Sequence, residues 1–396
     1  MEKNKLSNVF LIIFILLPFF IPSGLKVILP SINKILIPWG FISLGLTVIL
    51  YLKKKKINLN ILLIALFCLF LILPTILSPS GDLNNCISTV LSILTPCLLI
   101  DYSMNKNSLL TLRSLNLLFE VMVYLNLLTI LIYPNGMYIS STTGYYENWL
   151  LGYDNLHIFT IILAITFSVL YSYRKDDKIN LRSKLCILIC MLSIFIRWSG
   201  TAVIATSLIL IYLVFPKLIN KFPIFNIKSY FIAYIITFFG IVILRVQNKI
   251  SYFIVNILNK DITFTGRTFI WDYIINYIKA KPLLGYGIEL SSYRYNKSYI
   301  WRSYHAHNEF LEIFYTGGIA LFTVFMIILF NVIKKLYTNR NYKEVKFLSW
   351  IFLSVFVITL TEVYTISLFF LLIIVSMNIE QILKRGDNIE NKEFYL

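Results

Sequence analysis

Residues 59–77 read LNILLIALFCLFLILPTIL, an apolar run without a single charged residue. About 20 such residues are enough for a helix to cross the hydrocarbon core of a bilayer. Similar runs recur along the whole chain, and we count twelve, at residues 8–21, 34–52, 59–77, 85–100, 114–133, 155–173, 185–197, 199–215, 229–245, 307–333, 347–363 and 365–383. The sequence therefore predicts an all-α, polytopic integral membrane protein with about twelve transmembrane helices.

The overall composition supports the same class. Of the 396 residues, 58% are hydrophobic and 14% are charged, whereas an average soluble domain is about 45–50% apolar and about 25% charged. A soluble enzyme, a disordered chain and a disulfide-stapled secreted domain are excluded on these grounds. We expect a single membrane domain over residues 1–396. The five cysteines lie in or beside apolar runs and form no CxxC pair, so we expect no disulfide.

The formal net charge is +17, from 36 basic and 19 acidic residues. In a soluble protein this would suggest a nucleic-acid partner, but here the cations fall mostly in short loops between apolar runs. If the N-terminus is cytoplasmic, 24 of the 36 lie on the cytoplasmic side, as the positive-inside rule requires. The charges thus predict a multi-pass protein of the cell membrane with both termini in the cytoplasm and no nucleic-acid partner.

The longest polar stretch, residues 246–306, lies between the ninth and tenth predicted spans and is expected outside the cell. It is too long for a simple hairpin, and loops of this size are usually functional or disordered. Trp271, Trp301 and many tyrosines suit the membrane–water interface and also the stacking of sugars. Within the loop, residues 268–280 alternate polar and apolar positions at helical spacing, which predicts a short helix lying on the membrane surface.

Two of the three histidines, His305 and His307, stand where this loop enters the tenth predicted span. Their i, i+2 spacing is not the i, i+4 pair of a zinc-binding helix, so we expect no metal. Two other interpretations stay open. The histidines and Asn308 could simply cap the helix, or His307 could face a cavity beneath the loop as a base or hydrogen-bonding group.

Several charged residues are candidates for binding a substrate outside the membrane. Gly266-Arg267 opens the loop helix, and a helix N-terminus beside a guanidinium suits a phosphate or diphosphate. Arg197 interrupts an apolar stretch at the outer ends of two spans, where it either needs an anion or snorkels to the interface. Arg245, Arg294 and Arg302 could line the same cavity or be solvated charges. The outside acids are Asp82, Glu147, Asp154, Asp261, Asp272, Glu289, Glu309, Glu312 and Glu362.

One stretch of the chain carries a family pattern. In order, it contains Gly266-Arg267, Trp271, Lys281-Pro282-Leu283-Leu284-Gly285-Tyr286-Gly287, His307-Asn308-Glu309-Phe310-Leu311-Glu312 and Gly317-Gly318, followed by a long apolar span. This order and spacing, in a large outer loop before a span, resembles the bacterial O-antigen ligase and Wzy-type polysaccharide polymerase family. Family members often carry a Ser-Arg-Gly-like motif in an earlier span, where this chain has Arg197-Trp198-Ser199-Gly200.

The resemblance implies a metal-independent membrane glycosyltransferase at the outer face of the bacterial cytoplasmic membrane. Its donor would be a glycan on a polyprenyl diphosphate, and no cofactor is expected. By residue match, Arg267 would hold the diphosphate and His307 would act on the acceptor hydroxyl, with Arg197 assisting. We expect further substrate contacts from Asn308, Gly266, Trp271, Arg294, Arg302 and Glu309.

We interpret the chain as a polymerase of lipid-linked repeat units that makes a capsular or O-antigen-like polysaccharide. A ligase that moves finished glycan to a final acceptor is the alternative within the family, because it uses the same donor. The alternative from a different class is a flippase or other transporter, which would favour polar groups near mid-membrane and repeated halves. The expected partners are the glycan donor and acceptor and the bilayer, and other polysaccharide export and chain-length proteins are possible partners.

Overall fold

The computed structural model describes residues 2–54, 58–139, 147–153, 156–252, 256, 261–297 and 303–384. Nearly all of this part is helical. The helices are α1 (Glu2–Phe20), α2 (Ser23–Ile28), α3 (Ile32–Leu52), α4 (Leu59–Leu77), α5 (Leu83–Ile132), α6 (His157–Asp176), α7 (Leu181–Ile196), α8 (Gly200–Val214), α9 (Pro216–Ile219), α10 (Ile227–Thr237), α11 (Arg267–Ala280), α12 (Ser291–Lys297), α13 (Glu309–Thr338), α14 (Lys343–Thr361), α15 (Ile366–Met377) and α16 (Ile379–Leu383). A π-helical turn, Phe238–Ile243, extends α10, and a 3₁₀ turn, Val246–Ile250, follows it. β1 (Asn148–Trp149) and β2 (Gly152–Tyr153) pair antiparallel.

Six of the described helices are long and apolar enough to cross a membrane: α3, α4, α5, α6, α13 and α14. Four shorter apolar helices cover Leu6–Phe20, Gly200–Val214, Ile227–Ile243 and Ile366–Met377. The prediction of an all-α membrane protein is therefore confirmed, whereas the count of twelve spans stays a prediction. Large apolar side chains such as Ile49, Ile76 and Leu131 are at least 60% exposed. Such side chains are expected on a surface that faces lipid.

The 50-residue helix α5 covers two of the predicted runs, residues 85–100 and 114–133. Its backbone leaves the helical conformation at Asn107, with φ −152° and ψ 94°. The Asn107 side chain accepts a hydrogen bond from Leu110 N at 2.9 Å, which caps the second half of the helix. α5 packs against α1, α3, α4, α6, α7 and α15, and it therefore forms the centre of the bundle.

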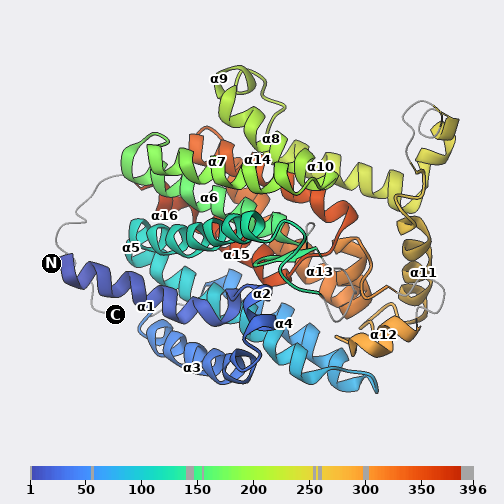
Figure 1. The fold of residues 1–396 in the computed structure, drawn as a ribbon. Helices are drawn as coiled ribbons and strands as arrows, with labels where there is room; N and C mark the ends of the chain where they lie inside the picture. Colours follow the sequence, from blue (N-terminus) through green and yellow to red (C-terminus); the bar gives the residue numbers. More distant parts are fainter. Residues whose placement is uncertain are drawn as a thin grey trace.

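The two ends of the bundle hold different parts of the chain. The start of α1 and helix α16 lie at one end, and α11 and α12 lie at the opposite end (Figure 1). The start of α1 and α16 are thus far from α11 and α12, and the predicted topology of the termini stays a prediction. A helix is present at the expected position as α11, whereas its location on the membrane surface stays a prediction. The sequence did not predict the second short helix, α12.

A break in α13 ties the loop to the bundle. Gly318 has φ 61° and ψ −160°, which interrupts the helix and leaves neighbouring backbone groups without helical partners. The segment 282–287 takes their place: Tyr286 N donates to the Tyr315 carbonyl at 3.0 Å, and Ile319 N donates to the Pro282 carbonyl at 2.8 Å. The glycine pair and the Lys-Pro-Leu-Leu-Gly-Tyr-Gly motif thus form one backbone joint. This joint places α11 and α12 over the start of α13.

Candidate functional site

The centre of the site is the carboxylate of Glu362, between the end of α14 and the start of α15. Its side chain is buried, and its two oxygens face different partners. Oε1 lies 3.0 Å from His307 Nδ1 and 3.6 Å from His305 Nε2. Oε2 lies 3.3 Å from the guanidinium of Arg267. We call these four residues the Glu362 cluster, which joins three separate segments of the chain.

The cluster has a defined charge state. Burial favours the neutral form of Glu362, but its close contact with His307 and the positive charge of Arg267 outweigh it. The pKa of Glu362 is therefore held below its usual range. Burial, reinforced by the charge of His307, lowers the pKa of His305 to about 4. At neutral pH Glu362 is thus an anion and His305 is neutral.

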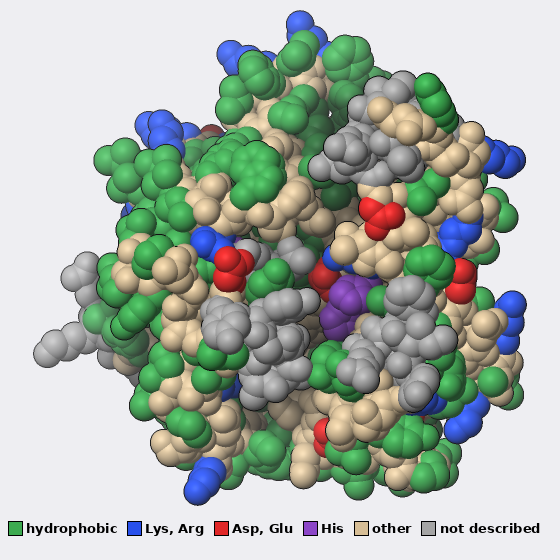
Figure 2. All heavy atoms as spheres, turned by 45° about the vertical axis from the view of Figure 1, so that its right-hand side comes forward, with side chains coloured by type: hydrophobic (Ala, Val, Ile, Leu, Met, Phe, Trp, Pro, Cys, Tyr) green, Lys and Arg blue, Asp and Glu red, His purple; other side chains and the backbone are tan. Residues whose placement is uncertain are grey.

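The two histidines are partly accessible from outside. About 31% of the His305 side chain and 26% of the His307 side chain are exposed. Figure 2 shows histidine side chains in a hollow near the middle of one face, with an acidic side chain beside them. A molecule that enters this hollow can therefore reach the imidazoles, while Glu362 stays behind them.

Asn308 fixes the position of His307. The Asn308 side chain is fully buried, and its Oδ1 accepts a hydrogen bond from Leu311 N at 3.0 Å, which caps α13. Its Nδ2 donates to the Leu360 carbonyl at 2.9 Å, two residues before Glu362. One side chain therefore ties the start of α13 to the end of α14. His307 itself has φ 48°, a left-handed conformation that turns the chain into the helix.

Arg267 is positioned by the turn before α11. Gly266 has φ 81°, and the two residues before it are also left-handed, so the chain reverses sharply here. The Asp261 carboxylate holds this turn by accepting hydrogen bonds from Thr263 N and Thr265 N, both at 2.8 Å. One turn into α11, the buried Trp271 donates from its indole nitrogen to the His307 carbonyl at 3.4 Å. Gly266 and Trp271 thus act on the site through backbone geometry and packing.

A second ion pair supports the histidine loop. Arg294, on α12, makes a two-pronged contact with Glu312 on α13, at 2.5 and 2.8 Å. Glu312 also accepts a hydrogen bond from Ala306 N at 2.8 Å, between the two histidines. The carboxylate of Glu309 is buried and accepts one from Tyr364 N at 3.1 Å. Arg302 lies outside the described residues.

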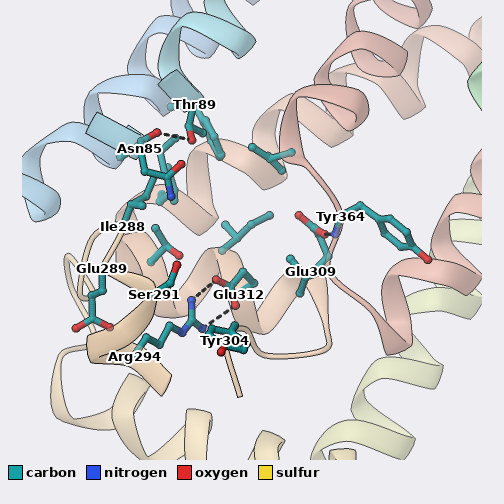
Figure 3. A pocket seen from close by; sticks show the side chains of 17 residues that line it. Asn85, Thr89, Ile288, Glu289, Ser291, Arg294, Tyr304, Glu309, Glu312 and Tyr364 are labelled. Atoms are coloured by element: carbon teal, nitrogen blue, oxygen red, sulfur yellow. Dashed lines mark hydrogen bonds and ion pairs between the residues drawn. The ribbon is translucent and has the colours of Figure 1, made fainter. Parts of the chain in front are cut away.

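A cavity of about 280 Å³ lies beside the cluster, between α4, α5, α12, α13 and the segment that follows Glu362. Figure 3 shows Arg294 paired with Glu312 on one wall, Glu309 and Tyr364 near it, and Asn85 and Thr89 on the opposite helix. Ligand cavities begin at roughly 300 Å³. The mixture of hydroxyl, amide, carboxylate and apolar groups on its walls suits a polar ring such as a sugar.

Residues 157–326 match the family model described as O-antigen ligase. This region belongs to the O-antigen ligase family. The resemblance read from the sequence is thereby confirmed. The O-antigen ligase region runs from α6 to α13 and contains Arg267, Trp271 and His307, whereas Glu362 lies beyond its end. No curated protein matches the chain.

Arg197 also lies in the O-antigen ligase region, but its described contacts are with a different segment. Its guanidinium lies 3.1 Å from Glu147, donates to the Pro134 carbonyl at 3.2 Å and sits 4.0 Å above the Trp149 ring. Arg245 packs beside α11, where it pairs with Asp272 at 2.6 Å. The structure therefore brings together Arg267 and His307, whereas Arg197 contacts Pro134, Glu147 and Trp149.

From the sequence alone, Glu362 was only one of nine acids predicted to lie outside. A usable signal was present, because Glu362 stands near the end of the apolar run 347–363, just before the next run, 365–383. An ionisable residue in such a position is a functional candidate by default. What the sequence did not contain was the identity of its partners His307, His305 and Arg267, which lie 55, 57 and 95 residues earlier in the chain.

Proposed function

We propose that this protein is a membrane glycosyltransferase that polymerises polyprenyl-diphosphate-linked oligosaccharide units into a surface polysaccharide at the outer face of the cytoplasmic membrane. The observation that carries the proposal is the Glu362 cluster, in which one carboxylate orients a histidine and holds an arginine. Such an arrangement can serve both halves of a glycosyl transfer, the removal of a proton and the departure of a diphosphate.

His307 would be the base. The anionic Glu362 has its Oε1 3.0 Å from His307 Nδ1, which favours the tautomer with the proton on Nδ1 and leaves Nε2 as the basic nitrogen. Nε2 takes the proton of the acceptor hydroxyl as its oxygen forms the bond to the anomeric carbon. The bond from that carbon to the diphosphate breaks at the same time, and the lipid diphosphate leaves with the electron pair.

Arg267 would stabilise the leaving group. Its contact with Glu362 is a single one at 3.3 Å, and 20% of its side chain is exposed. The remaining guanidinium donors are therefore available to a diphosphate, which carries more negative charge than the carboxylate. A fixed cation near developing charge is the usual largest contribution to such a reaction. Arg197, which contacts Glu147 and Trp149, would bind a different part of the donor.

The cavity of about 280 Å³ supports a place for one sugar beside the reacting groups. It reaches Glu309 and Tyr364, which lie two residues after His307 and Glu362 in the chain. The aromatic side chains of α11 and α12 would stack on further sugars outside it. This arrangement leaves the site open toward the outside, where a long glycan can extend.

A ligase that transfers finished glycan to a final acceptor is the second candidate, and the description of the matched family favours it. The two reactions differ only in the acceptor. The test is to give purified protein in nanodiscs the lipid-linked repeat unit alone and to examine the products on a gel. A polymerase makes a ladder of chain lengths, whereas a ligase makes no product until a separate lipid acceptor is added.

Two controls make this experiment decisive. His307→Ala protein measured alongside shows the background, and a chelator in the buffer tests whether a metal is needed. We expect the ladder with donor alone and in the presence of chelator. Translocation of the donor across vesicles without any new glycosidic bond would instead indicate a flippase and overturn the proposal.

A further inference from the structure

We propose that His305, His307 and Glu362 form a reversible binding site for a transition-metal dication such as Zn²⁺, and that the bound ion switches transfer off. One ligand atom from each of His305, His307 and Glu362 lies within 4.8 Å of the other two. The sequence argued against a metal because the histidines are only two residues apart. The structure supplies the missing third ligand from another helix end.

The distances suit a small ion. Zinc binds imidazole nitrogen and carboxylate oxygen at about 2.0–2.2 Å in a tetrahedral arrangement, which places its ligand atoms about 3.3 Å apart. Glu362 Oε1 lies 3.0 Å from His307 Nδ1 and 3.6 Å from His305 Nε2, and these two distances bracket about 3.3 Å. Two imidazoles and one carboxylate favour zinc, copper or nickel over magnesium or calcium, which prefer oxygen ligands alone. A water can take the fourth position from the open hollow.

Arg267 would act as an outer partner of the metal site. Arg267 contacts Oε2 of Glu362. The other oxygen, Oε1, therefore stays directed at the histidines and is free to bind the metal. Partners of this kind orient ligating groups. The positive charge of Arg267 also opposes a dication, which makes this a reversible site and not one that holds its metal permanently.

Binding requires only a local rearrangement of protons. His305 Nδ1 now accepts a long contact from His307 N at 3.3 Å, so the neutral ring carries its proton on Nε2. When the metal takes Nε2, that proton moves to Nδ1 and the weak contact is lost. On His307 the proton moves the other way, from Nδ1 to Nε2. No proton is gained or lost overall.

The expected inhibition rests on the proposed function. Once a metal occupies Nδ1 of His307, its Nε2 carries a proton and cannot accept one from the acceptor hydroxyl. The ion also neutralises the Glu362 carboxylate that orients the ring. The metal is therefore an inhibitor in this proposal, and the transfer reaction itself needs none.

The first test measures binding alone, so it does not depend on the transferase activity. Purified full-length protein is titrated with Zn²⁺ against a chromophoric chelator, and Co²⁺ is used in parallel for its absorption spectrum. We expect one tight equivalent with nitrogen and oxygen ligands. A sulfur-to-metal charge-transfer band would place the ion on the buried cysteines and overturn the proposal.

Variants assign the ligands. Loss of an outer partner weakens metal sites by about 10–100-fold, and loss of a direct ligand should cost at least as much. We therefore expect His305→Ala and Glu362→Gln to weaken zinc binding by at least about tenfold, whereas Asp272→Asn, an exposed acid on α11, should not. Unchanged zinc affinity in both His305→Ala and Glu362→Gln refutes the site.

The second test measures transfer in the presence of zinc. His305 is outside the reacting groups, so His305→Ala should keep measurable activity and should resist zinc concentrations that inhibit the wild type. Excess chelator should restore the wild-type rate. Zinc that binds at these residues without slowing transfer overturns the inhibition. An inactive wild type would refute the proposed function and leave the binding result standing.

Discussion

At the residue scale, the division of labour between the two oxygens of Glu362 decides what the site can do. One oxygen faces the imidazoles of His305 and His307, and the other faces Arg267. The carboxylate therefore couples the group that would take a proton to the group that would face the leaving diphosphate. Removing any one of them changes the charge that the others experience.

The first prediction concerns His307. A positioned base contributes about 10²–10⁴-fold to a rate, so His307→Ala should lower transfer by that factor while the protein remains in the membrane. His305→Ala should be milder, since its imidazole is the more distant one from Glu362. The measurement is the chain-length ladder formed from lipid-linked donor. Long chains at the wild-type rate from His307→Ala would reduce this residue to a structural role.

The second prediction concerns Arg267. Arg267→Ala removes a cation from the leaving group and should lower the rate by about 10²–10³-fold, as loss of one stabilising donor typically does. Arg267→Lys keeps the charge without the planar fork and should retain part of the activity. Lys279→Ala, at an exposed position of the same helix, is the matched control. Equal activity of all three variants contradicts the role in leaving-group stabilisation.

The third prediction concerns the pH dependence of stability. The pKa of His305 is about 4 in the folded protein against an ordinary value of 6.5. Between these values the unfolded chain binds a proton that the folded protein does not, so stability should fall as the pH drops from about 7 to 5. The thermal midpoint in detergent should fall less over this range for His305→Asn. Parallel curves for the two proteins would show that His305 does not contribute.

At the element scale, the joint between the 282–287 segment and the break in α13 determines where the outer helices sit. Gly285 and Gly287 have φ 66° and 75°, and both pack directly against backbone. A methyl group on Gly285 would come 2.4 Å from the Tyr315 carbonyl oxygen, and one on Gly287 would come 2.5 Å from the Thr75 backbone. The glycines of this motif are thus needed because the backbone passes too close to its neighbours for a side chain to fit.

The fourth prediction tests this joint. Gly318 has φ 61° and ψ −160°, a region that is essentially restricted to glycine, and its added methyl would come 2.4 Å from the Leu283 carbonyl. Strain of this kind costs about 1–3 kcal/mol before any clash is counted. Gly318→Ala should therefore lower both the thermal midpoint and the transfer rate.

Gly45→Ala is the matched control for this prediction. Gly45 lies within α3, and a methyl group added there meets nothing within 4 Å. Because alanine is the better helix former, this variant should be as stable as the wild type or slightly more stable. If the Gly318 and Gly45 variants melt at the same temperature, the joint does not matter for stability.

At the scale of the whole molecule, the bundle separates two chemically distinct ends. The end that holds α11, α12 and the Glu362 cluster lies opposite the start of α1 and α16 (Figure 1). The buried Asp101 belongs to the bundle interior near Lys54, which it contacts at 2.5 Å, together with Tyr51 at 2.9 Å. Asp101 on α5 thus holds the end of α3 through Tyr51 and Lys54.

The fifth prediction concerns orientation. With both termini in the cytoplasm, a cysteine at position 279 on α11 should react with a membrane-impermeant reagent in intact cells. A cysteine at position 53 should react only after the cells are opened. Both positions are exposed, whereas Lys54 is paired with Asp101 and is a poor probe position. The five native cysteines are removed first. Labelling at 53 but not at 279 in intact cells would invert the topology.

Much of this protein could be predicted from its sequence, because membrane insertion depends on local properties. The apolar runs give the helices, and the pattern from Gly266 to Gly318 gives the family. The outer location of the polar stretch 246–306 stays a prediction. The loop helix was expected at 268–280 and is present at Arg267–Ala280. A helix in lipid forms wherever the chain is apolar, since every backbone group must be satisfied within its own segment.

Only the tertiary structure brought Glu362 to His307 and Arg267, and only it showed Asn308 tied to Leu360. Hydropathy does not say which helix ends meet, because lipid tails are as apolar as the helices and give no preference among neighbours. The neighbours are chosen by close packing and by hydrogen bonds between helices. These depend on side-chain shape and on breaks such as that at Gly318. The site is therefore a property of the packed bundle and not of any single span.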